Sequence, residues 1–299
     1  DLCPRYSAHY VYDVKIGESP LWMKRRLALV GMTSISNVVD ITNYVLKEIG
    51  QPMHAFDGSY LEGNEICVRR AKDAEKIITL DEQEYEMNTD NLVICDGVKP
   101  VALAGVMGGL NSEIRDTTES VIFESAKFAR DSVRKTARSL GKSTDASARY
   151  EKGVDEYSTV LGMKRALHLI EELQCGKVSS THVDINTGNS IEPTEMKVSI
   201  SKVNGVLGIT VPEEDIVRIM KNLDFAPTVE GDQLTIHVPA YREDMLPNGE
   251  NDVERYPDVA EEVIRMYGYD HIVPTFLPTA QVTMGGLNKK QKGELALKR

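Results

Sequence analysis

The sequence has few cysteines and no long apolar run, and both shortages exclude classes of protein. Its 299 residues include four cysteines, Cys3, Cys67, Cys95 and Cys175, none of which forms a C-x-x-C pair. Scattered thiols argue against a disulfide framework, a zinc ribbon or a redox dithiol, and favour a reducing compartment, the cytoplasm. No segment approaches the ~18 consecutive apolar residues of a membrane helix, so we expect no membrane contact.

Familiar catalytic signatures are missing as well. The sequence has no G-x-S-x-G, H-E-x-x-H, P-loop or G-x-G-x-x-G motif, which argues against the hydrolases and nucleotide-binding proteins built on them. It starts Asp-Leu-Cys-Pro-Arg-Tyr, without an initiator methionine or a signal-peptide pattern. We therefore expect a segment of a longer protein.

The charge is acidic overall, with one basic stretch. Lys and Arg number 35 against 46 Asp and Glu, a net charge of −11, which excludes a basic coat for nucleic acid and leaves only a local patch. Between Ser125 and Gly153 there are eight basic residues against three acidic ones: Lys127, Arg130, Arg134, Lys135, Arg138, Lys142, Arg149 and Lys152. They predict either a phosphate-backbone contact or an ordinary solvated helix face.

The length predicts about two domains. Residues 1–187 have the pattern of one α/β domain, with β-rich runs over 65–124 and a long helix near 155–174. Ser19-Pro20 predicts an N-cap for a short helix that ends at Gly31, and a second helix ends at Gly50. Residues 188–275 predict a smaller α+β domain, and residues 276–299 a basic linker toward an absent domain. The fold class is thus mixed α+β.

The smaller domain has the pattern of a helix-turn-helix followed by a hairpin. Short helices are expected at 201–207 and after Pro212, then a strand through Ile236 and a helix near 258–267. Such an arrangement occurs in small nucleic-acid-binding folds, but residues 197–275 hold 7 basic against 15 acidic residues. This charge argues against DNA binding.

Four segments carry residues suited to chemistry. His54 follows an apolar turn and is either a site for water or a substrate hydroxyl, or a structural histidine. Gly105 and Gly108 belong to a glycine-rich run that either admits a ligand close to the backbone or forms a tight turn. Glu124 ends an apolar strand, where a carboxylate needs a donor, either an arginine or a hydroxyl on a ligand. Thr144 either offers a hydroxyl to a pocket or caps the helix that follows.

An acidic cluster marks the smaller domain. Asp258, Glu261 and Glu262 share one face of a predicted helix, and Asp244 precedes them. Carboxylates suit Mg²⁺, but acidic residues in a first helical turn also favour the helix dipole. Between Asp244 and Asp258 lie 13 residues.

Together these segments resemble the β subunit of bacterial phenylalanyl-tRNA synthetase. The similar stretches occur in the family's order over nearly the whole chain: LCPRYSA, SNVVDITNYVLKEIGQPMHAFD, LAGVMGGLNSEI, VIFESAKF, STDASARYEKGVD, VPAYREDM and DVAEEVIRMYGYDHI. The resemblance implies the B3/B4 editing domain with a mixed sheet, followed by the B5 domain. Two departures are the missing arginine after Gly31 and a longer link between Asp244 and Asp258.

The resemblance also implies a function. The family's β subunit hydrolyses tyrosine wrongly attached to tRNA(Phe), because an apolar pocket built for phenylalanine rejects an added hydroxyl only weakly. Glu124 would accept the phenolic proton, and phenylalanine would leave this carboxylate unpaired. The matching positions are catalytic for His54, Glu124 and Thr144, substrate-binding for Asn43, Pro52, Gly105, Gly108 and Ala146, and magnesium-linked for Asp244, Asp258, Glu261 and Glu262.

The implied partners are the synthetase α subunit, in an α2β2 heterotetramer, and tRNA(Phe). ATP would be used by the whole enzyme and not bound here. Three alternatives stay open: a non-catalytic scaffold or RNA-binding module, a stand-alone relative of the editing domain, and an acidic helix-turn-helix regulator.

Overall fold

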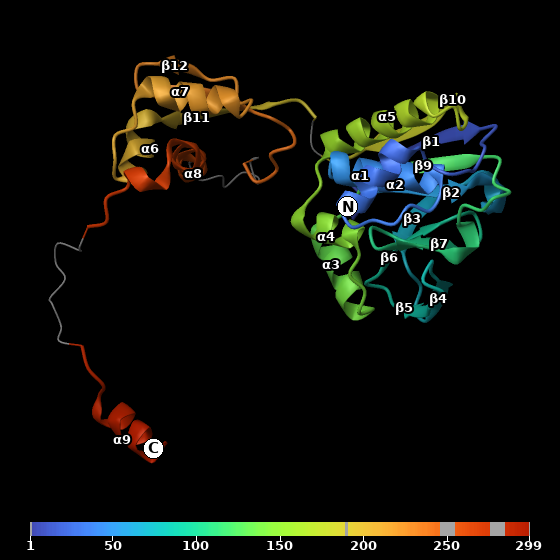
Figure 1. Ribbon diagram of the computed structural model, residues 1–299, viewed down its shortest axis with the longest axis horizontal. Helices are drawn as coiled ribbons and strands as arrows, with labels where there is room; N and C mark the ends of the chain where they lie inside the picture. Colours follow the sequence, from blue (N-terminus) through green and yellow to red (C-terminus); the bar gives the residue numbers. More distant parts are fainter. Residues whose placement is uncertain (1, 189–190, 246–254, 276–284, 299) are drawn as a thin grey trace.

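The computed structural model describes residues 2–188, 191–245, 255–275 and 285–298. Within them the chain forms two packed units, and each unit combines helices with a sheet (Figure 1). The mixed α+β class predicted from the sequence is therefore confirmed.

A four-stranded sheet organises the first unit. Its strands are β1 (Arg5–Tyr12), β2 (Met53–Asp57), β9 (Val121–Lys127) and β10 (Lys177–Asn186). The order is β10-β1-β9-β2, and all three pairs are antiparallel. β1 and β2 run in the same direction, but β9 lies between them. The mixed sheet expected for this domain is therefore wrong in the part of the chain that the structure describes, because strands that share a direction are not neighbours.

Helices cover one face of this sheet (Figure 1). They are α1 (Leu21–Leu29), α2 (Asn37–Glu48) and α5 (Glu156–Glu172). Side chains alternate between the two faces of a strand, so Val121 and Phe123 of β9 point to these helices and join one core with Val45 and Leu169. Glu124, the next residue along the strand, therefore stands on the opposite face.

A second sheet packs on that opposite face. It has the order β3-β6-β7-β8, with β3 (Cys67–Arg70), β6 (Leu92–Cys95), β7 (Pro100–Leu103) and β8 (Met107–Gly108). A hairpin of β4 (Glu75–Ile78) and β5 (Glu84–Met87) and three short 3₁₀ turns, η1 (Gly58–Tyr60), η2 (Glu62–Asn64) and η3 (Leu110–Ser112), complete this layer. Phe56, Ile94, Leu103 and Ala126 form the second core, between the sheets.

Two helices close one side of this second core. α3 (Arg130–Ser139) and α4 (Asp145–Lys152) contribute the buried side chains of Val133, Ala137 and Tyr150. The sequence indicates a polar loop before a helix at 143–153, but most of this segment is itself helical, as α4. The bounds of α3 were not predicted, and a solvated helix face was only one alternative for the basic stretch, because the few apolar residues of α3 give only a narrow buried stripe.

The start of α1 differs from the expectation. Pro20 is the N-cap residue, without a side-chain hydrogen bond, so the cap predicted for Ser19 is wrong. The Ser19 hydroxyl instead donates to Asp40 Oδ2 at 2.6 Å. Because Asp40 is fully buried on α2, this bond satisfies a carboxylate that would otherwise be costly to bury.

The second unit is a small module in which helices pack on a three-stranded sheet. Its strands are β11 (Thr194–Ser199), β12 (Thr228–Glu230) and β13 (Gln233–Val238), in the order β11-β13-β12. Its helices are α6 (Ile200–Leu207), α7 (Glu213–Asn222) and α8 (Tyr256–Tyr267), followed by the 3₁₀ turn η4 (Tyr269–His271). Val203, Ile219, Ile236 and Val263 meet in its core. The predicted succession of helix, turn, helix and hairpin is confirmed.

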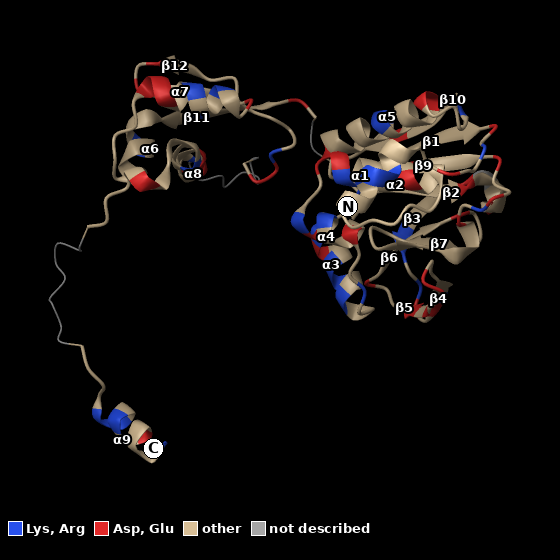
Figure 2. Ribbon diagram, in the orientation of Figure 1, with Lys and Arg blue, Asp and Glu red and all other residues tan. Residues whose placement is uncertain are grey.

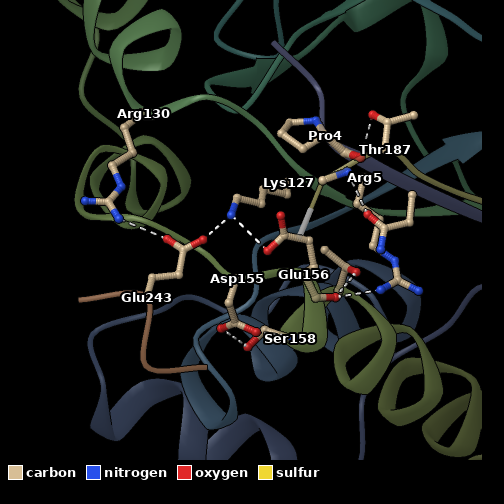
Figure 3. Close-up of polar contacts among 12 residues, drawn as sticks. Pro4, Arg5, Lys127, Arg130, Asp155, Glu156, Ser158, Thr187 and Glu243 are labelled. Atoms are coloured by element: carbon tan, nitrogen blue, oxygen red, sulfur yellow. Dashed lines mark hydrogen bonds and ion pairs between the residues drawn. The ribbon is translucent and has the colours of Figure 1, made fainter. Parts of the chain in front are cut away.

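An ion-pair network joins the two units (Figure 3). Lys127, at the end of β9, contacts Glu156 of α5 and also Glu243, which follows β13. Arg130 contacts the same Glu243 at 3.0 Å. Glu243 and Lys127 are both largely buried, so water screens this pair less than an exposed one.

The predicted linker at 276–299 contains a helix, α9 (Lys289–Leu297), in its described part. Residues 276–284 lie outside the described residues. Among the helices that the structure describes, none has the length and apolar character needed to cross a bilayer.

A pair of glycines in the second unit tests its helix geometry. Gly205 lies inside α6 with open space where a Cβ would lie, whereas Gly208 follows α6 at φ +67°. We expect Gly205→Ala to raise the free energy of unfolding by about 0.5–1 kcal/mol, because alanine loses less backbone entropy in a helix. Gly208→Ala should lower it by about 1 kcal/mol. Urea unfolding of both variants measures the difference; equal effects would contradict the assigned geometry.

Candidate functional site

A cavity lies between the two sheets of the first unit. It has a volume of about 250 Å³ and an apolar wall from β6, β7 and the loop that follows. All eight residues to which the sequence assigned catalytic or substrate-binding roles line it: Asn43, Pro52, His54, Gly105, Gly108, Glu124, Thr144 and Ala146. The structure thus brings together residues that are up to 103 positions apart in the sequence, and their roles stay predictions.

Glu124 is the buried acid of this cavity. It lies on the inner face of β9 and is 5% exposed. Among the described residues its side chain has one hydrogen bond, from the Tyr6 hydroxyl to Oε2 at 2.8 Å, and no ion pair. Burial raises the pKa of Glu124 to about 7, although the Tyr6 hydrogen bond lowers it. A carboxyl without a cation is therefore available to a ligand.

His54 lies directly across the sheet from Glu124. The two residues are paired in the β2–β9 register, so their side chains share one face. The ring packs edge-on against Phe56, and its Nε2 atom is buried without a hydrogen-bond partner among the described residues. Burial lowers the pKa of His54 to about 4, so the imidazole is neutral at physiological pH.

The glycine-rich loop forms the wall opposite His54. A Cβ at Gly108 would overlap the imidazole at Cε1 and Nε2. Gly105 has φ +70°, and a Cβ there would lie 2.9 Å from the Tyr150 ring. The run makes the turn into β8, as one of the two alternatives had it, and it also lines the cavity. That it admits a ligand stays a prediction.

The Thr144 hydroxyl is used in two hydrogen bonds within the fold. It donates to Val106 O at 2.8 Å and accepts from Ser147 N at 3.1 Å, as the N-cap of α4. This is the capping alternative considered from the sequence. Thr144 thereby ties α4 to the glycine-rich loop, and the structure gives no free donor there for a substrate.

α2 and the start of α4 form one side of the cavity. Asn43 comes from α2, and Asp145 and Ala146 from the first turn of α4. Lys47 forms an ion pair with Asp145 at 3.1 Å, which links the two helices and neutralises a carboxylate at the rim.

Tyr6 is a contact of Glu124 that was not predicted from the sequence. It comes from β1, donates to Glu124 and lines a second cavity together with Leu2 and Cys3. Burial, together with Glu124, raises the pKa of the Tyr6 phenol, so it stays a donor. Ala8 opposes Glu124 in the register, and Tyr6, two residues away, has its side chain on the same face as Glu124. The sequence could indicate this contact only if the strand order were known.

Comparison with known proteins agrees with this geometry. Residues 2–175 match the family model described as the B3/4 domain, and residues 196–269 match that of the tRNA synthetase B5 domain. The chain belongs to the B3/4 domain family. All eight cavity residues fall within the matched B3/4 range.

The B3/4 chain is also similar to longer proteins. It is 44% identical over 281 residues to the phenylalanine–tRNA ligase beta subunit of Syntrophus aciditrophicus, covering 93% of this chain and 34% of that protein. It is 43% identical over 288 residues to the same subunit of Geobacillus kaustophilus, covering 96% and 35%. The chain thus spans about a third of the length of these relatives. The resemblance stated from the motifs is confirmed.

A solved structure is similar at a lower level. It is an N-terminal fragment of the phenylalanyl-tRNA synthetase beta subunit from Pyrococcus horikoshii, with 12% identity and a TM-score of 0.41, covering 90% of this chain and 72% of that chain. A likeness this low supports no conclusion.

The acidic residues of the second unit are not arranged as metal ligands. The resemblance assigned Asp244, Asp258, Glu261 and Glu262. Arg242 binds Asp244 through two nitrogens at 2.9 and 2.7 Å and Glu262 at 3.0 Å, and Arg255 contacts Asp258 at 3.3 Å.

These arginines compete with any cation. The Arg242 guanidinium lowers the pKa of Asp244, and the described residues hold no group of three or more His, Cys, Asp or Glu placed to bind a metal. The four residues therefore do not fit Mg²⁺ in this arrangement. The inserted residues 246–254 lie outside the described part of the chain.

Gly108→Ala tests the contact between the loop and the imidazole. The new methyl group overlaps the His54 ring, so we expect the ring to shift and the free energy of unfolding to fall by about 1–3 kcal/mol. NMR shifts of the imidazole and urea unfolding measure both effects. Gly205→Ala, at a position with open space, is the control; an unmoved imidazole in Gly108→Ala would contradict the contact.

The two perturbed groups make opposite contributions to stability against pH. Glu124 titrates near 4.5 in the unfolded chain and about 7 in the folded one, so its contribution is full below pH 4.5 and is lost as the pH rises through 7. His54 titrates near 6.5 unfolded and about 4 folded, so its contribution is lost as the pH falls from 6.5 toward 4. Each contribution is about 3 kcal/mol. Between pH 4.5 and 6.5 the two contributions change in opposite directions with pH and largely cancel.

Glu124→Gln removes one of these opposing contributions and keeps an oxygen for the Tyr6 hydroxyl. We expect the free energy of unfolding of the variant, minus that of the parent, to be about 2 kcal/mol higher at pH 7.5 than at pH 5. Urea unfolding at both pH values measures it. A difference independent of pH would show that Glu124 is not buried in this way.

Proposed function

We propose that this chain is the editing part of a phenylalanine–tRNA ligase β subunit and that its cavity hydrolyses tyrosine wrongly esterified to tRNA(Phe). The observation that carries the proposal is Glu124, a buried carboxyl that faces a cavity and has no cation among the described residues. Burying such a group is costly, and a ligand that donates a hydrogen bond to it recovers part of that cost.

The Tyr6 contact supports a phenol as that ligand. The hydroxyl of Tyr6 donates to Glu124 Oε2 at 2.8 Å, so this carboxyl already accepts from one phenol. A tyrosyl side chain entering the cavity would donate to the same group from the other side. Phenylalanine lacks the hydroxyl and would leave the carboxylate without this donor, at a cost of about 1–3 kcal/mol.

The described lining offers no free hydroxyl, thiol or amine nucleophile, which favours direct attack by water. Thr42 donates to Val39 O at 2.7 Å, Thr144 to Val106 O at 2.8 Å and Tyr150 to Ala126 O at 2.9 Å. The described lining includes no Ser, Cys or Lys. Every hydroxyl in it is thus already donated to a backbone carbonyl.

Neutral His54 is the group that would orient the water. Its unpartnered Nε2 supplies a lone pair or a proton, depending on the tautomer. The water oxygen attacks the ester carbonyl carbon, the bond to the ribose oxygen breaks, and that oxygen takes a proton. Free tyrosine and uncharged tRNA result. Positioning the water against the ester would account for much of the increase in the rate of hydrolysis.

The rest of the enzyme lies beyond this chain. We propose that ATP-dependent aminoacylation takes place on an α subunit in an α2β2 heterotetramer, in the cytoplasm, with tRNA(Phe) as the shared substrate. ATP would not be bound by this chain.

The test compares deacylation of Tyr-tRNA(Phe) and Phe-tRNA(Phe) by the full-length protein with its α subunit. We expect Glu124→Ala to reduce the preference for tyrosine, in kcat/KM, by about 10- to 100-fold, because the acceptor of the phenol is lost. Radiolabelled amino acid released from each tRNA measures the preference.

Glu171→Ala, on the exposed side of α5, is the matched control and should leave the preference unchanged. An unaltered preference in Glu124→Ala would contradict the assigned acceptor. No tyrosine-selective hydrolysis by the parent protein would refute editing and favour the non-catalytic RNA-binding or scaffold alternative.

A further inference from the structure

The basic stretch found in the sequence divides into two groups in the structure. Three of its cations have acidic partners: Lys127 and Arg130 bind Glu243, and Lys142 binds Asp81 at 2.6 Å. The remaining five form no ion pair with any residue that the structure describes. We call them the basic ridge: Arg134, Lys135, Arg138, Arg149 and Lys152.

The ridge lies on the exposed faces of α3 and α4. Arg134, Lys135 and Arg138 are exposed, and their spacing places them on one side of α3. Arg149 and Lys152 are exposed in the same way on α4. Figure 2 shows Lys and Arg gathered along these two helices. The opposite faces are held by the core through Val133 and Tyr150, so the ridge stands on a rigid support.

The ridge begins next to residues that line the cavity. Asp145 and Ala146, in the first turn of α4, line the cavity, and Arg149 and Lys152 follow about 6 and 10 Å farther along the helix axis, at 1.5 Å per residue. This is the range of one to two phosphates along a single strand. α3 packs against α4 and extends the same surface.

Few acidic groups oppose this charge. Asp145, at the rim, is already paired with Lys47, which leaves Asp131 on α3 and Glu151 on α4 as the ridge's own acidic neighbours. The chain has a net charge of −11, so a group of five such cations beside a cavity runs against its overall charge. They fit a polyanion whose end enters that cavity.

We propose that the basic ridge binds the sugar-phosphate backbone of the tRNA strand whose aminoacylated end enters the cavity. The inference rests on the proposed function for the identity of the RNA. The cations contact phosphates and hold the strand in register, and they read no base. The ester then reaches Glu124 and His54 because the strand is fixed at the mouth.

The test measures affinity of the 299-residue chain for uncharged tRNA(Phe) by fluorescence anisotropy at several salt concentrations. The variant is Arg134→Gln/Arg138→Gln/Arg149→Gln. We expect at least a tenfold loss of affinity at low salt and a decrease of about 2 in the slope of log K against log salt, because three phosphate contacts are lost.

The control is Lys164→Gln, an exposed cation on α5, which covers the other face of the first sheet. It should change neither the affinity nor the slope. Circular dichroism confirms that all variants are folded. Unchanged affinity and slope in the triple variant, or no measurable tRNA binding by the parent, overturn the proposal.

A second measurement separates this inference from the proposed function. The triple variant and the parent are compared on Tyr-tRNA(Phe) and on tyrosine esterified to adenosine, which lacks the strand. We expect a raised KM for the tRNA and an unchanged rate for the small ester. If the parent hydrolyses neither substrate, the editing proposal fails, and the affinity measurement still decides whether the ridge binds RNA.

Discussion

The structure of the site depends on one carboxyl group buried between two sheets without a cation among the described residues. Glu124 stands on the inner face of β9 and accepts a hydrogen bond from the Tyr6 phenol. Because a neutral hydroxyl stabilises a carboxylate less than a guanidinium would, the group keeps both a raised pKa, about 7, and the capacity to accept another donor. A lysine in place of Tyr6 would form an ion pair with Glu124 and leave it less able to accept a hydrogen bond from a ligand.

The pairing of β2 with β9 places His54 beside Glu124 on the same face of the sheet. His54 opposes Glu124 in register, and burial acts on the two in opposite directions, raising the pKa of the acid and lowering that of the imidazole. Burial disfavours the charged form of each group, so both are costly to fold. Groups of this kind cluster at functional sites, and here they face one cavity.

Outside the cavity, the cations of the second unit differ from those of α3 and α4 in whether they have acidic partners. In the second unit Arg242 and Arg255 neutralise carboxylates that the resemblance associated with magnesium. Along α3 and α4, in contrast, cations remain without acidic partners in the described part of the chain. The difference separates arginines that hold a module together from cations that are available to a ligand.

The sequence alone predicts many of the elements and marks most of the residues that line the cavity. The long helix near 155–174 and the helices after Pro212 and near 258–267 follow from apolar spacing, and the motifs marked eight residues that line the cavity. It did not determine Tyr6, α3 or the use of Ser19 and Thr144. Those depend on which strand lies beside β9 and which backbone groups come near each hydroxyl. Long-range packing decides which strand and which backbone groups lie beside these residues. Local periodicity indicates only which side chains face the core.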